Sequence, residues 1–594
     1  MLKFQDKVVV VTGSGTGIGK AIATKFVENG ASVVILGRRK EPLEETAKRL
    51  QQIIDSMKSK AFVRIFAGVD VSDEDGVSSM FEELKKSVGT VDIVVNNAGV
   101  SGPVTCFANA PIDEFKSTVA IHLTGTFWTS VQALKAMKSG SKIITISTFF
   151  AEERPLEQRP YRFRSPYTAS QGAKNRLAEA MSWELTEKGI ISIATNPGPV
   201  HSDRIYKTVY PKAAAEFMRV SGFENLTPQE VEGVNNDILP LMGEEEQTVK
   251  NGIKNAAAKL AKTKGITSEA EIQKLNNTIA TLLSKIQQIA EKVQLNTSKM
   301  IADEQFLSQE QVAETVLALC DDKISRILNG KVIPGDRVFY PVKPHISSTI
   351  PESTADLSSK VIVFTIDSSE ESDIARVEFL AQNIEKSGGK VVILYSKNIA
   401  KQAQDRLSKF HSHAIEFTKE NVGRMLKTAS EKIGTISMII HMTGRVPSFS
   451  KITELSRSQW DSLVDKFIIT PAIIGQECLN IFVPGGAKNP PLFKGKSGTM
   501  AIIGPDLPVG AKISGAERAK VDVFRGALRP FATTVNQELS DVLKSNVRIF
   551  LVLPGSIDGN EPSNEKIFSA VKYFASGKAI SSSEVIFYPD ETRS

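Results

Sequence analysis

The chain has 594 residues and a formal net charge of +6, and one hydrophobic core does not grow to that length, so we expect two or more domains. Hydrophobic residues make up 41% and charged residues 24% of the sequence, which is typical of globular proteins, and the small net charge does not indicate a nucleic-acid surface. Cys106, Cys320 and Cys478 are isolated from one another and therefore indicate neither a disulfide framework nor a metal site. No apolar run reaches the roughly 18 residues of a membrane-spanning helix, and the N-terminus lacks the apolar stretch of a signal peptide, so we expect a cytoplasmic protein without membrane contact.

Short apolar runs alternate with helical patterns through the first 200 residues. The runs predict strands buried on both faces at Lys7–Val11, Ser32–Leu36, Arg64–Val69, Val91–Asn96, Lys142–Ser147 and Ile191–Thr195. Helical patterns lie between them, as at Gly17–Asn29 and Glu41–Ser59. This alternation predicts an α/β domain with a doubly wound parallel sheet.

A glycine-rich segment, TGSGTGIG, links the first predicted strand to the first predicted helix. Gly13 permits a tight turn, Gly17 lets the backbone approach a pyrophosphate, and Gly19 allows close packing of helix and strand. The N-terminus of the following helix offers unpaired N–H groups to the phosphates. We therefore predict a cofactor site that includes Gly13, Ser14, Thr16, Gly17, Ile18 and Gly19.

The end of the second predicted strand indicates which nicotinamide cofactor binds. An NAD-dependent enzyme places an acidic residue there to hold the ribose 2′-hydroxyl, whereas this chain reads Leu36-Gly37-Arg38-Arg39-Lys40. Arginine pairs well with a phosphate, so we predict NADPH, bound through Arg38 and Arg39. The alternative is that these charges form a solvated loop.

The pattern changes after the sixth predicted strand. From about residue 204 to 311 the sequence is mostly polar with helical periodicity, as in Glu269–Val293, and contains no strand-like run. We expect a helical insertion that either caps an active site or serves as a solvated spacer or oligomerisation arm, because amphipathic periodicity does not distinguish these. Residues 346–358 are rich in Pro, Ser and Thr and are typical of a linker, so the first domain is expected at 1–345.

The alternation restarts after the linker and predicts a second domain at 359–594. Its predicted strands are Val361–Asp367, Val391–Tyr395, Met438–Met442, Thr499–Gly504 and Arg548–Leu553. Helices are expected between them, including Arg457–Asn480 and Gly515–Leu543. The predicted fold is therefore α/β, with two tandem Rossmann-like doubly wound parallel-sheet domains of which the first carries the helical insertion.

Several motifs of the first domain resemble those of the short-chain dehydrogenase/reductase family. TGSGTGIG resembles the family's TGxxxGxG, Asn96–Gly99 spells its NNAG, and Tyr167–Ser170 begins its YxASK. With Asp70-Val71 and Pro197-Gly198, the matches span residues 5–205. The resemblance implies an NADP-dependent oxidoreductase whose further cofactor contacts come from Asp70, Val71, Asn97, Ala98, Gly99, Pro197 and Gly198.

The same resemblance implies catalytic roles. Tyr167 takes the place of the proton donor or acceptor, and Thr148, with Ser147 as the alternative, takes the place of the hydroxyl that holds the substrate oxygen. The position of the family's Lys holds Gln171, and the position of its relay Asn holds His122. A neutral Gln can bind ribose but supplies no charge to stabilise a tyrosinate, so we expect carbonyl reduction to suffer less than alcohol oxidation.

Two nearby residues have open interpretations. Lys174 lies one helical turn beyond Gln171 and about 60° around the helix, and we expect it to be a solvated surface charge that does not reach the site. His122 either replaces the relay Asn or is a packed, hydrogen-bonded histidine.

The segment between Thr148 and Tyr167 is long for the family and rich in arginine. We predict that a small anionic or CoA-linked substrate is bound by Arg154, Arg159, Arg162, Arg164 and Arg204, since guanidinium groups suit carboxylates and phosphates. The alternative is a solvated loop, with its charge balanced by Glu152, Glu153 and Glu157.

This loop, the segment Pro197–Arg204, the helical insertion and the second domain together resemble one half of the bifunctional malonyl-CoA reductases, in particular the thioester-reducing half. Each half of those enzymes pairs an active short-chain dehydrogenase domain with a companion that lacks the active-site residues. The resemblance implies an NADPH-dependent reductase of a small acyl-CoA thioester or its semialdehyde. The alternatives are a generic NADP-dependent ketone or alcohol oxidoreductase and a non-catalytic NADP(H)-binding scaffold.

The second domain lacks the motifs of the first. Glu370 and Glu371 stand where a phosphate-binding turn would be, and acids there repel the cofactor. His441–Gly444 replaces NNAG, Gly504-Pro505 replaces the catalytic hydroxyls, and Ala511–Phe531 contains no YxxxK. We predict that this domain binds no nucleotide and serves packing or assembly, and we expect the protein to be a homodimer, the commonest assembly.

Overall fold

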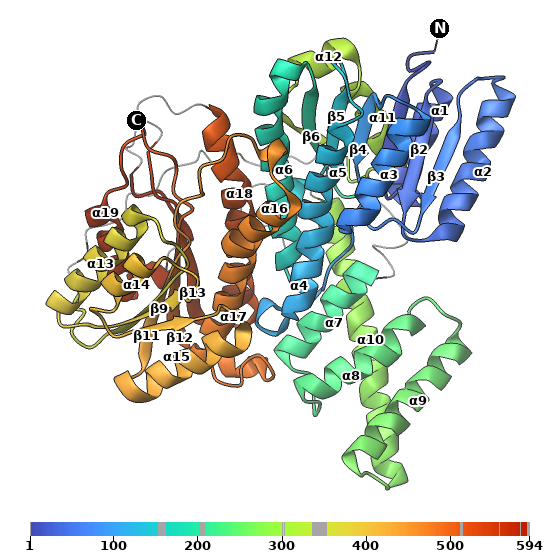
Figure 1. Cartoon of the computed structure of the whole chain (residues 1–594). Helices are drawn as coiled ribbons and strands as arrows, with labels where there is room; N and C mark the ends of the chain where they lie inside the picture. Colours follow the sequence, from blue (N-terminus) through green and yellow to red (C-terminus); the bar gives the residue numbers. More distant parts are fainter. Residues whose placement is uncertain are drawn as a thin grey trace.

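Two parallel sheets of seven strands, one in each half of the chain, form the framework of the computed structural model (Figure 1). The structure describes residues 2–151, 162–200, 208–299, 301, 303–335, 353, 355–510, 515–556, 559–581 and 584–590. Both sheets carry helices on both faces, so the predicted α/β fold of two tandem Rossmann-like domains is confirmed.

The strands of the first sheet lie in the order β3-β2-β1-β4-β5-β6-β7. Their bounds are β1 (Val8–Thr12), β2 (Ser32–Gly37), β3 (Val63–Ala67), β4 (Ile93–Asn96), β5 (Lys142–Ile146), β6 (Ile191–Pro197) and β7 (Val332–Gly335). The order reverses between β1 and β4, and ligands of such sheets bind at the carboxyl ends of the strands beside that reversal. The edge strand β7 is not predicted from sequence, because its four residues are partly exposed and include a proline.

Helices cover both faces of this sheet. One face packs against α1 (Gly17–Glu28), α2 (Lys40–Ser56) and α11 (Gln309–Leu319), and α12 (Asp322–Ile327) follows α11. The other face packs against α3 (Glu74–Ser87), α4 (Ile112–Val119), α5 (Gly125–Leu134) and α6 (Ser165–Leu185). Val9 and Val11 of β1 point to the first face and Val10 to the second, as the two-residue period of a strand requires.

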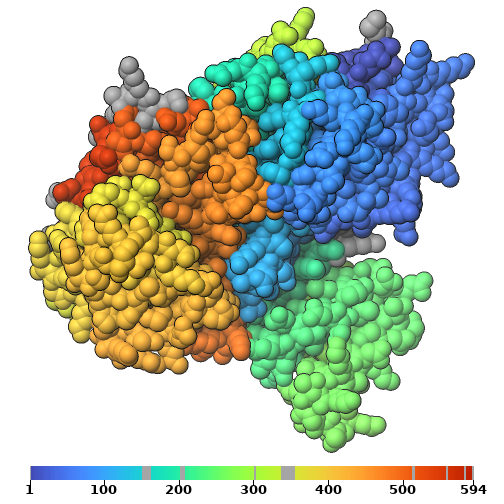
Figure 2. Space-filling view, viewed as in Figure 1, coloured from blue at the N-terminus to red at the C-terminus, as the bar shows by residue number. Residues whose placement is uncertain are grey.

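The insertion is helical, with α7 (Tyr210–Ser221), α8 (Pro228–Ile238), α9 (Glu246–Lys264) and α10 (Glu269–Ser298). These helices share a hydrophobic core of their own, in which Val231, Leu260, Leu282 and Ile286 are buried. The space-filling view shows this green lobe projecting beyond both sheets (Figure 2). The core anchors α7 and α10, which also reach the first sheet's pocket, as described below.

The second sheet repeats the strand order of the first, as β10-β9-β8-β11-β12-β13-β14. Its strands are β8 (Val361–Ile366), β9 (Lys390–Ser396), β10 (Ser412–Ile415), β11 (Ile436–Met442), β12 (Ser497–Ile503), β13 (Asn546–Val552) and β14 (Ile586–Phe587). Its helices are α13 (Glu371–Lys386), α14 (Lys401–Leu407), α15 (Lys419–Ile433), α16 (Arg457–Val464), α17 (Thr470–Phe482), α18 (Gly515–Gln537) and α19 (Asn564–Ala575). The short edge strands β10 and β14 are again the ones that sequence patterns miss.

The two domains meet through equivalent helices. In the first domain α4 has eight residues and passes through a π-helical turn of five residues, Ala120–Thr124, into α5. In the second, α16 has eight residues and passes through a five-residue π-helical turn, Asp465–Ile469, into α17. The last long helices, α6 and α18, cross at Gly172 and Gly526, where a Cβ on either residue would collide with the backbone of the other.

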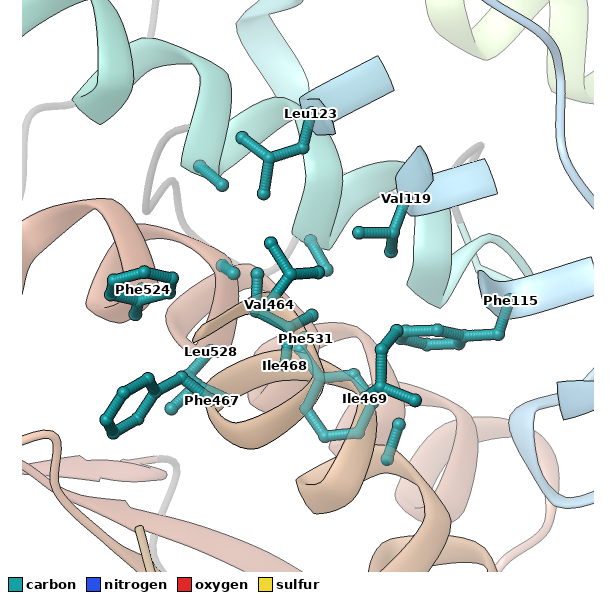
Figure 3. Close-up of a cluster of buried hydrophobic side chains, with 14 of the residues drawn as sticks. Phe115, Val119, Leu123, Val464, Phe467, Ile468, Ile469, Phe524, Leu528 and Phe531 are labelled. Carbon is teal, nitrogen blue, oxygen red and sulfur yellow. The ribbon is translucent and has the colours of Figure 1, made fainter. Parts of the chain in front are cut away.

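This domain interface, formed by α4–α6 and α16–α18, is a continuous hydrophobic core. Figure 3 shows Phe115, Val119 and Leu123 of the first domain facing Val464 and other side chains of the second. Trp460 of the second domain stacks on Phe127 of the first, with ring centroids 4.0 Å apart. The outer face of α6 is therefore buried, which matters for the active site below.

None of the helices in the described parts of the chain combines the length and the apolarity needed to cross a membrane.

Candidate active site

A pocket lies at the carboxyl ends of β5 and β6, where α1, α6 and the insertion meet. It is lined by Ile18, Ile146, Ser147, Thr148, Arg164, Tyr167, Pro197, Gly198, Pro199, Val200, Val209, Tyr210 and Thr297. Its empty volume, counted together with the open space at its mouth, is about 660 Å³. The pocket thus brings together residues predicted for catalysis, for substrate binding and for cofactor binding.

The glycine-rich turn is built as its sequence predicts. Gly13 and Gly17 have φ of +66° and +62°, a region that favours glycine. A Cβ on Gly19 would collide with the carbonyl oxygen of Gly13 and the side chain of Asn97. Asn97 Nδ2 donates to the carbonyl oxygen of Thr12 at 2.9 Å. Asn97 therefore braces the turn, while the N-terminus of α1 stays directed to the cofactor crevice.

Other members of the predicted cofactor set also have roles inside the fold. Ser14 is fully buried, and its Oγ donates to the carbonyl oxygen of Val11 at 2.8 Å and accepts from Leu36 N at 3.1 Å. The Ala98 amide donates to Thr12 Oγ1 at 2.8 Å. The hydroxyl of Ser14 thus ties β1 to β2, and a contact from this residue to a phosphate would come from its backbone.

The cations after β2 lie at the open edge of the turn. Arg38 pairs with Asp70 at 3.5 Å, and its side chain is 59% exposed. Arg39 Nη2 donates to Thr16 Oγ1 at 3.4 Å. Val71, which follows Asp70, is buried against Gly125. Two exposed guanidinium groups thus flank Thr16, the N-cap residue of α1.

Tyr167 lies in the pocket beneath a guanidinium group. The Arg164 Cζ is 3.8 Å from the centroid of the Tyr167 ring, and Arg164 Nη2 donates to the carbonyl oxygen of Ser101 at 2.9 Å. Ser147 Oγ donates to the backbone oxygen of Gln171 at 2.9 Å. Since Ser147 is engaged in this way, Thr148 is the hydroxyl residue better placed to face a substrate.

His122 is buried in the π-helical turn beside Tyr167. Its ring meets the Tyr167 ring edge-on, with centroids 5.3 Å apart. His122 Nε2 lies 2.8 Å from the carbonyl oxygen of Val100, to which the Nε2–H tautomer donates. A Cβ on Gly99 would collide with the imidazole. The side chain is thus packed and hydrogen-bonded, and it also touches Tyr167.

The structure corrects the expectation for Lys174. The residue is 1% exposed, and its Nζ donates to the carbonyl oxygen of Ile146 at 2.6 Å. Burial lowers the pKa of Lys174 to about 7. The expectation of a solvated charge was wrong because Lys174 lies on the side of α6 that faces the sheet, where its amine bonds Ile146, one of the residues that line the pocket.

Gln171 is buried as well, in the turn of α6 that precedes Lys174. It is 4% exposed, and its Oε1 has no hydrogen-bond partner among the described residues. A buried amide oxygen without a partner in the protein is uncommon. This oxygen can accept a hydrogen bond from a hydroxyl group of a ligand.

The predicted substrate arginines separate into three groups. Arg164 lines the pocket, whereas Arg162 forms an ion pair with Asp541 of the second domain at 2.5 Å. The structure therefore uses Arg162 at the domain interface and not at the pocket, a difference that the sequence of this loop does not reveal. Arg154, Arg159 and Arg204 lie outside the described residues.

Sequence reasoning missed the pocket residues supplied by the insertion. Val209 and Tyr210 come from the start of α7, and Thr297 comes from the end of α10. Of the alternatives for the insertion, these contacts favour a cap over a solvated spacer. The adjacent apolar residues Val209 and Tyr210 in an otherwise polar stretch are the sequence signal for these contacts.

The corresponding crevice of the second domain is filled by its own side chains. Arg525, which precedes Gly526 as Gln171 precedes Gly172, donates to the carbonyl oxygens of Pro505 and Pro554 at 2.8 and 2.5 Å. Arg376 pairs with Asp506 at 2.5 Å, and both side chains are buried. These contacts join the ends of β12 and β13, where the first domain has its pocket.

The fold and the site define a class. A glycine-rich turn at the switch point of a doubly wound sheet, with a tyrosine and a threonine at the carboxyl ends of its strands, is the arrangement of Rossmann-fold oxidoreductases. Among the described residues, no group of three or more His, Cys, Asp or Glu side chains is placed to hold a metal ion.

Comparison with known proteins identifies the family. The family model for short chain dehydrogenases matches residues 7–210. The uncharacterized oxidoreductase YxbG of Bacillus subtilis (strain 168) is 32% identical over 208 residues, which are 35% of this chain and 71% of that protein. An uncharacterized oxidoreductase of Staphylococcus aureus (strain USA300) is 32% identical over 204 residues, 34% of this chain and 80% of that protein. The chain belongs to the short-chain dehydrogenase/reductase family and is an oxidoreductase.

Solved structures match the complete two-domain architecture. The C-domain of a bacterial malonyl-CoA reductase, determined with NADP, has a TM-score of 0.71 and 15% identity, and covers 96% of this chain and 95% of its own. The N-domain of such an enzyme, also with NADP, has a TM-score of 0.67 and 17% identity, and covers 99% and 98%. The likeness to one half of malonyl-CoA reductase is thus confirmed as a likeness of fold.

Proposed function

We propose that the first domain binds NADPH and reduces a small acyl-CoA thioester or its semialdehyde. The observation that carries the proposal is the position of Arg164, whose guanidinium lies 3.8 Å from the Tyr167 ring inside the pocket. A buried cation beside a proton donor suits a substrate that brings a carboxylate or a phosphate to the site.

The cofactor site fits NADPH at both of its phosphate positions. The positive-φ turn at Gly13 and Gly17 leaves the N-terminus of α1 open toward a pyrophosphate, and Arg38 and Arg39 offer exposed guanidinium groups to a 2′-phosphate. The two malonyl-CoA reductase domains of the same fold were determined with NADP, which supports this choice. When bound, the nicotinamide supplies the hydride of the reduction.

The chain's own residues supply the proton and hold the substrate. Tyr167 donates its phenolic proton to the substrate oxygen, and the Thr148 hydroxyl binds the same oxygen. Gln171 binds cofactor ribose without adding charge, and Arg164 provides the positive charge that stabilises developing negative charge at the phenol. The positive charge that the family's Lys supplies thus comes here from Arg164, which lies against the tyrosine ring.

The second domain, His122 and the outer surfaces have other roles in this proposal. The second domain binds no nucleotide, because Arg525 and the Arg376–Asp506 pair occupy its crevice. His122 packs against Tyr167 and keeps its ring in place. A homodimer of the complete chain would use surfaces other than the α4–α6 face, which the second domain covers.

The test is NADPH oxidation with malonyl-CoA, succinyl-CoA and malonic semialdehyde in turn. We expect turnover with at least one of them, and a loss of about 10²- to 10⁴-fold in kcat for Tyr167→Phe, the usual contribution of a general acid. Tyr573→Phe, a change on α19 of the second domain, is the matched control and should leave kcat unchanged.

Two other outcomes would support one of the alternative functions. Turnover of neutral ketones alone, indifferent to Arg164→Gln, would favour a generic ketone reductase. Tight NADPH binding without any turnover would favour a non-catalytic scaffold, the alternative suggested by Gln171, and activity gained by Gln171→Lys would then mark the missing charge as its cause.

A further inference from the structure

A carboxylate of the second domain is buried against the active-site loops of the first. Glu538 begins the π-helical turn Glu538–Val542 that ends α18, and it is 1% exposed. Its Oε2 accepts the Phe107 amide at 2.7 Å, and its Oε1 accepts the Phe163 amide at 2.7 Å. One side chain thus ties together two segments of the other domain that are far apart in sequence.

The first domain has an equivalent glutamate that reaches the other way. Glu184, near the end of α6, accepts the amides of Ile452 at 2.6 Å and Thr453 at 3.0 Å. Ile452 begins a 3₁₀ turn of three residues, as Phe107 does in the first domain. The two contacts are related by the pseudo-symmetry of the domain interface and differ in one respect: the second bond of Glu538 goes to Phe163, the residue before Arg164.

Phe163 occupies a backbone conformation that needs support. Its φ is +70°, a backbone angle that residues other than glycine rarely adopt. Its carbonyl oxygen accepts the Thr105 amide at 2.8 Å, and its amide is held by Glu538. The preceding residue, Arg162, pairs with Asp541 of the same π-helical turn. The backbone that leads into Arg164 is therefore fixed from the second domain at two successive residues.

The surroundings of Glu538 contain few compensating charges. Glu216 of α7 accepts the Cys106 amide at 2.7 Å and pairs with Arg219 at 2.6 Å. Burial raises the pKa of Glu538 to about 7, and the charge of Glu216 adds to this. Burial also raises the pKa of Cys106, so that this thiol stays neutral.

We propose that Glu538 is a positioning residue of the active site: by holding the amides of Phe107 and Phe163, it keeps Arg164 stacked on Tyr167. This gives the second domain a defined part in the reaction of the first. The kinetic consequence rests on the proposed function, whereas the structural consequence does not.

The structural test uses Glu538→Gln with Glu184→Gln as its matched control. A Gln offers one acceptor oxygen where Glu offers two, so each variant loses one amide contact in the opposite domain. In the cofactor-free protein we expect amide hydrogen exchange at Phe107 or Phe163 to rise at least tenfold in Glu538→Gln and to stay unchanged in Glu184→Gln, which should instead accelerate exchange at Ile452 or Thr453.

Unchanged exchange at both Phe107 and Phe163 in Glu538→Gln would overturn the proposal, and so would equal acceleration there in Glu184→Gln. If Glu538→Gln does not fold, Glu538→Asp serves as the second variant. It keeps the negative charge but shortens the side chain by one methylene group, so that the carboxylate lies farther from the two amides. It is expected to give the same exchange pattern, and normal exchange in it would overturn the proposal as well.

The kinetic test is the pH profile of NADPH-dependent reduction. The ionised carboxylate accepts both amides, so wild type and Glu184→Gln should share an inflection in kcat/KM near pH 7. Glu538→Gln should lose this inflection and show a KM for the substrate about tenfold higher, with NADPH affinity unchanged. An inflection and KM that persist in Glu538→Gln would refute the positioning role, whereas a wild type that turns over no substrate would refute the proposed function and leave the exchange result to decide.

Discussion

The two domains share one strand order and differ in what occupies the crevice at the carboxyl ends of their strands. In the first domain, the glycine turn and the ends of β5 and β6 leave a pocket of about 660 Å³. In the second, Arg525 joins the ends of β12 and β13, and the Arg376–Asp506 pair is buried nearby. The same strand order therefore surrounds an open crevice in one domain and a crevice bridged by side chains in the other, and both domains contribute helices to the interface.

The difference separates the features that pack the two domains together from the features of the pocket. The π-helical turns at the same place in both domains and the close contact of Gly172 with Gly526 belong to the interface. The open glycine turn and Tyr167 belong to the first domain alone. Changes in the open crevice and changes in the filled crevice should therefore have separable effects on cofactor binding and on stability.

The largest expected effect concerns Lys174, a lysine whose amine is buried against the end of β5. Its pKa of about 7 lies below the roughly 10.4 of an unfolded chain, so between these pH values the unfolded state binds a proton that the folded state does not. The free energy of unfolding should then rise by about 1.4 kcal/mol per pH unit, about 4–5 kcal/mol over the window, and this gain is lost again as the pH falls from about 10 to 7. Lys174→Met should abolish the slope.

Urea unfolding at several pH values between 7 and 10 measures this difference. Lys188→Met, a change of an exposed lysine just after α6, is the control and should keep the wild-type slope. Parallel pH dependences for Lys174→Met and wild type would mean that the folded state keeps Lys174 charged.

The error about Lys174 shows what the sequence can and cannot predict. The interior strands, the glycine turn and the repeated sheet follow from local patterns, because a strand buried on both faces is apolar wherever it occurs. The burial of Lys174 leaves no local sign in the sequence, because it depends on a contact between α6 and the end of β5, which are separate segments of the chain. For the same reason the loop sequence does not distinguish Arg164, which enters the pocket, from Arg162, which pairs with the second domain.

The next effect concerns the filled crevice. Asp506→Asn leaves the buried Arg376 without its counter-charge, and removing one partner of a buried pair destabilises a protein by about 3–5 kcal/mol. We expect a loss of this order in thermal or urea unfolding, with NADPH affinity unchanged. Asp405→Asn, which breaks the exposed pair with Lys401, should change stability by less than about 1 kcal/mol. A drop in NADPH affinity for Asp506→Asn would instead show that the second crevice takes part in cofactor binding.

A smaller effect is expected at the open crevice of the first domain. Replacing Arg38 and Arg39 by Ala removes the groups proposed for the 2′-phosphate, and the loss of such charge-assisted hydrogen bonds should weaken NADPH binding by about tenfold to a hundredfold. NADH binding should change little, because NADH lacks the phosphate. Fluorescence titration with NADPH and with NADH measures both affinities, and Arg49→Ala, on α2, is the control. Equal weakening for both cofactors would remove the basis for the NADPH preference.

The smallest effect concerns the two helix positions, four residues apart, that hold a tyrosine and a lysine in the family's YxASK motif. On α6, Tyr167 is followed four residues later by the neutral Gln171, whereas the equivalent positions of α18 hold Val521 and the cation Arg525. At this pair of helix positions the first domain thus has the tyrosine without the cation, and the second has the cation without the tyrosine. Gln171→Lys restores both on α6, and because a nearby cation favours the ionised tyrosine, we expect the kcat of alcohol oxidation to rise by about tenfold. An unchanged kcat for alcohol oxidation would show that Arg164 already supplies all the charge that Tyr167 can use.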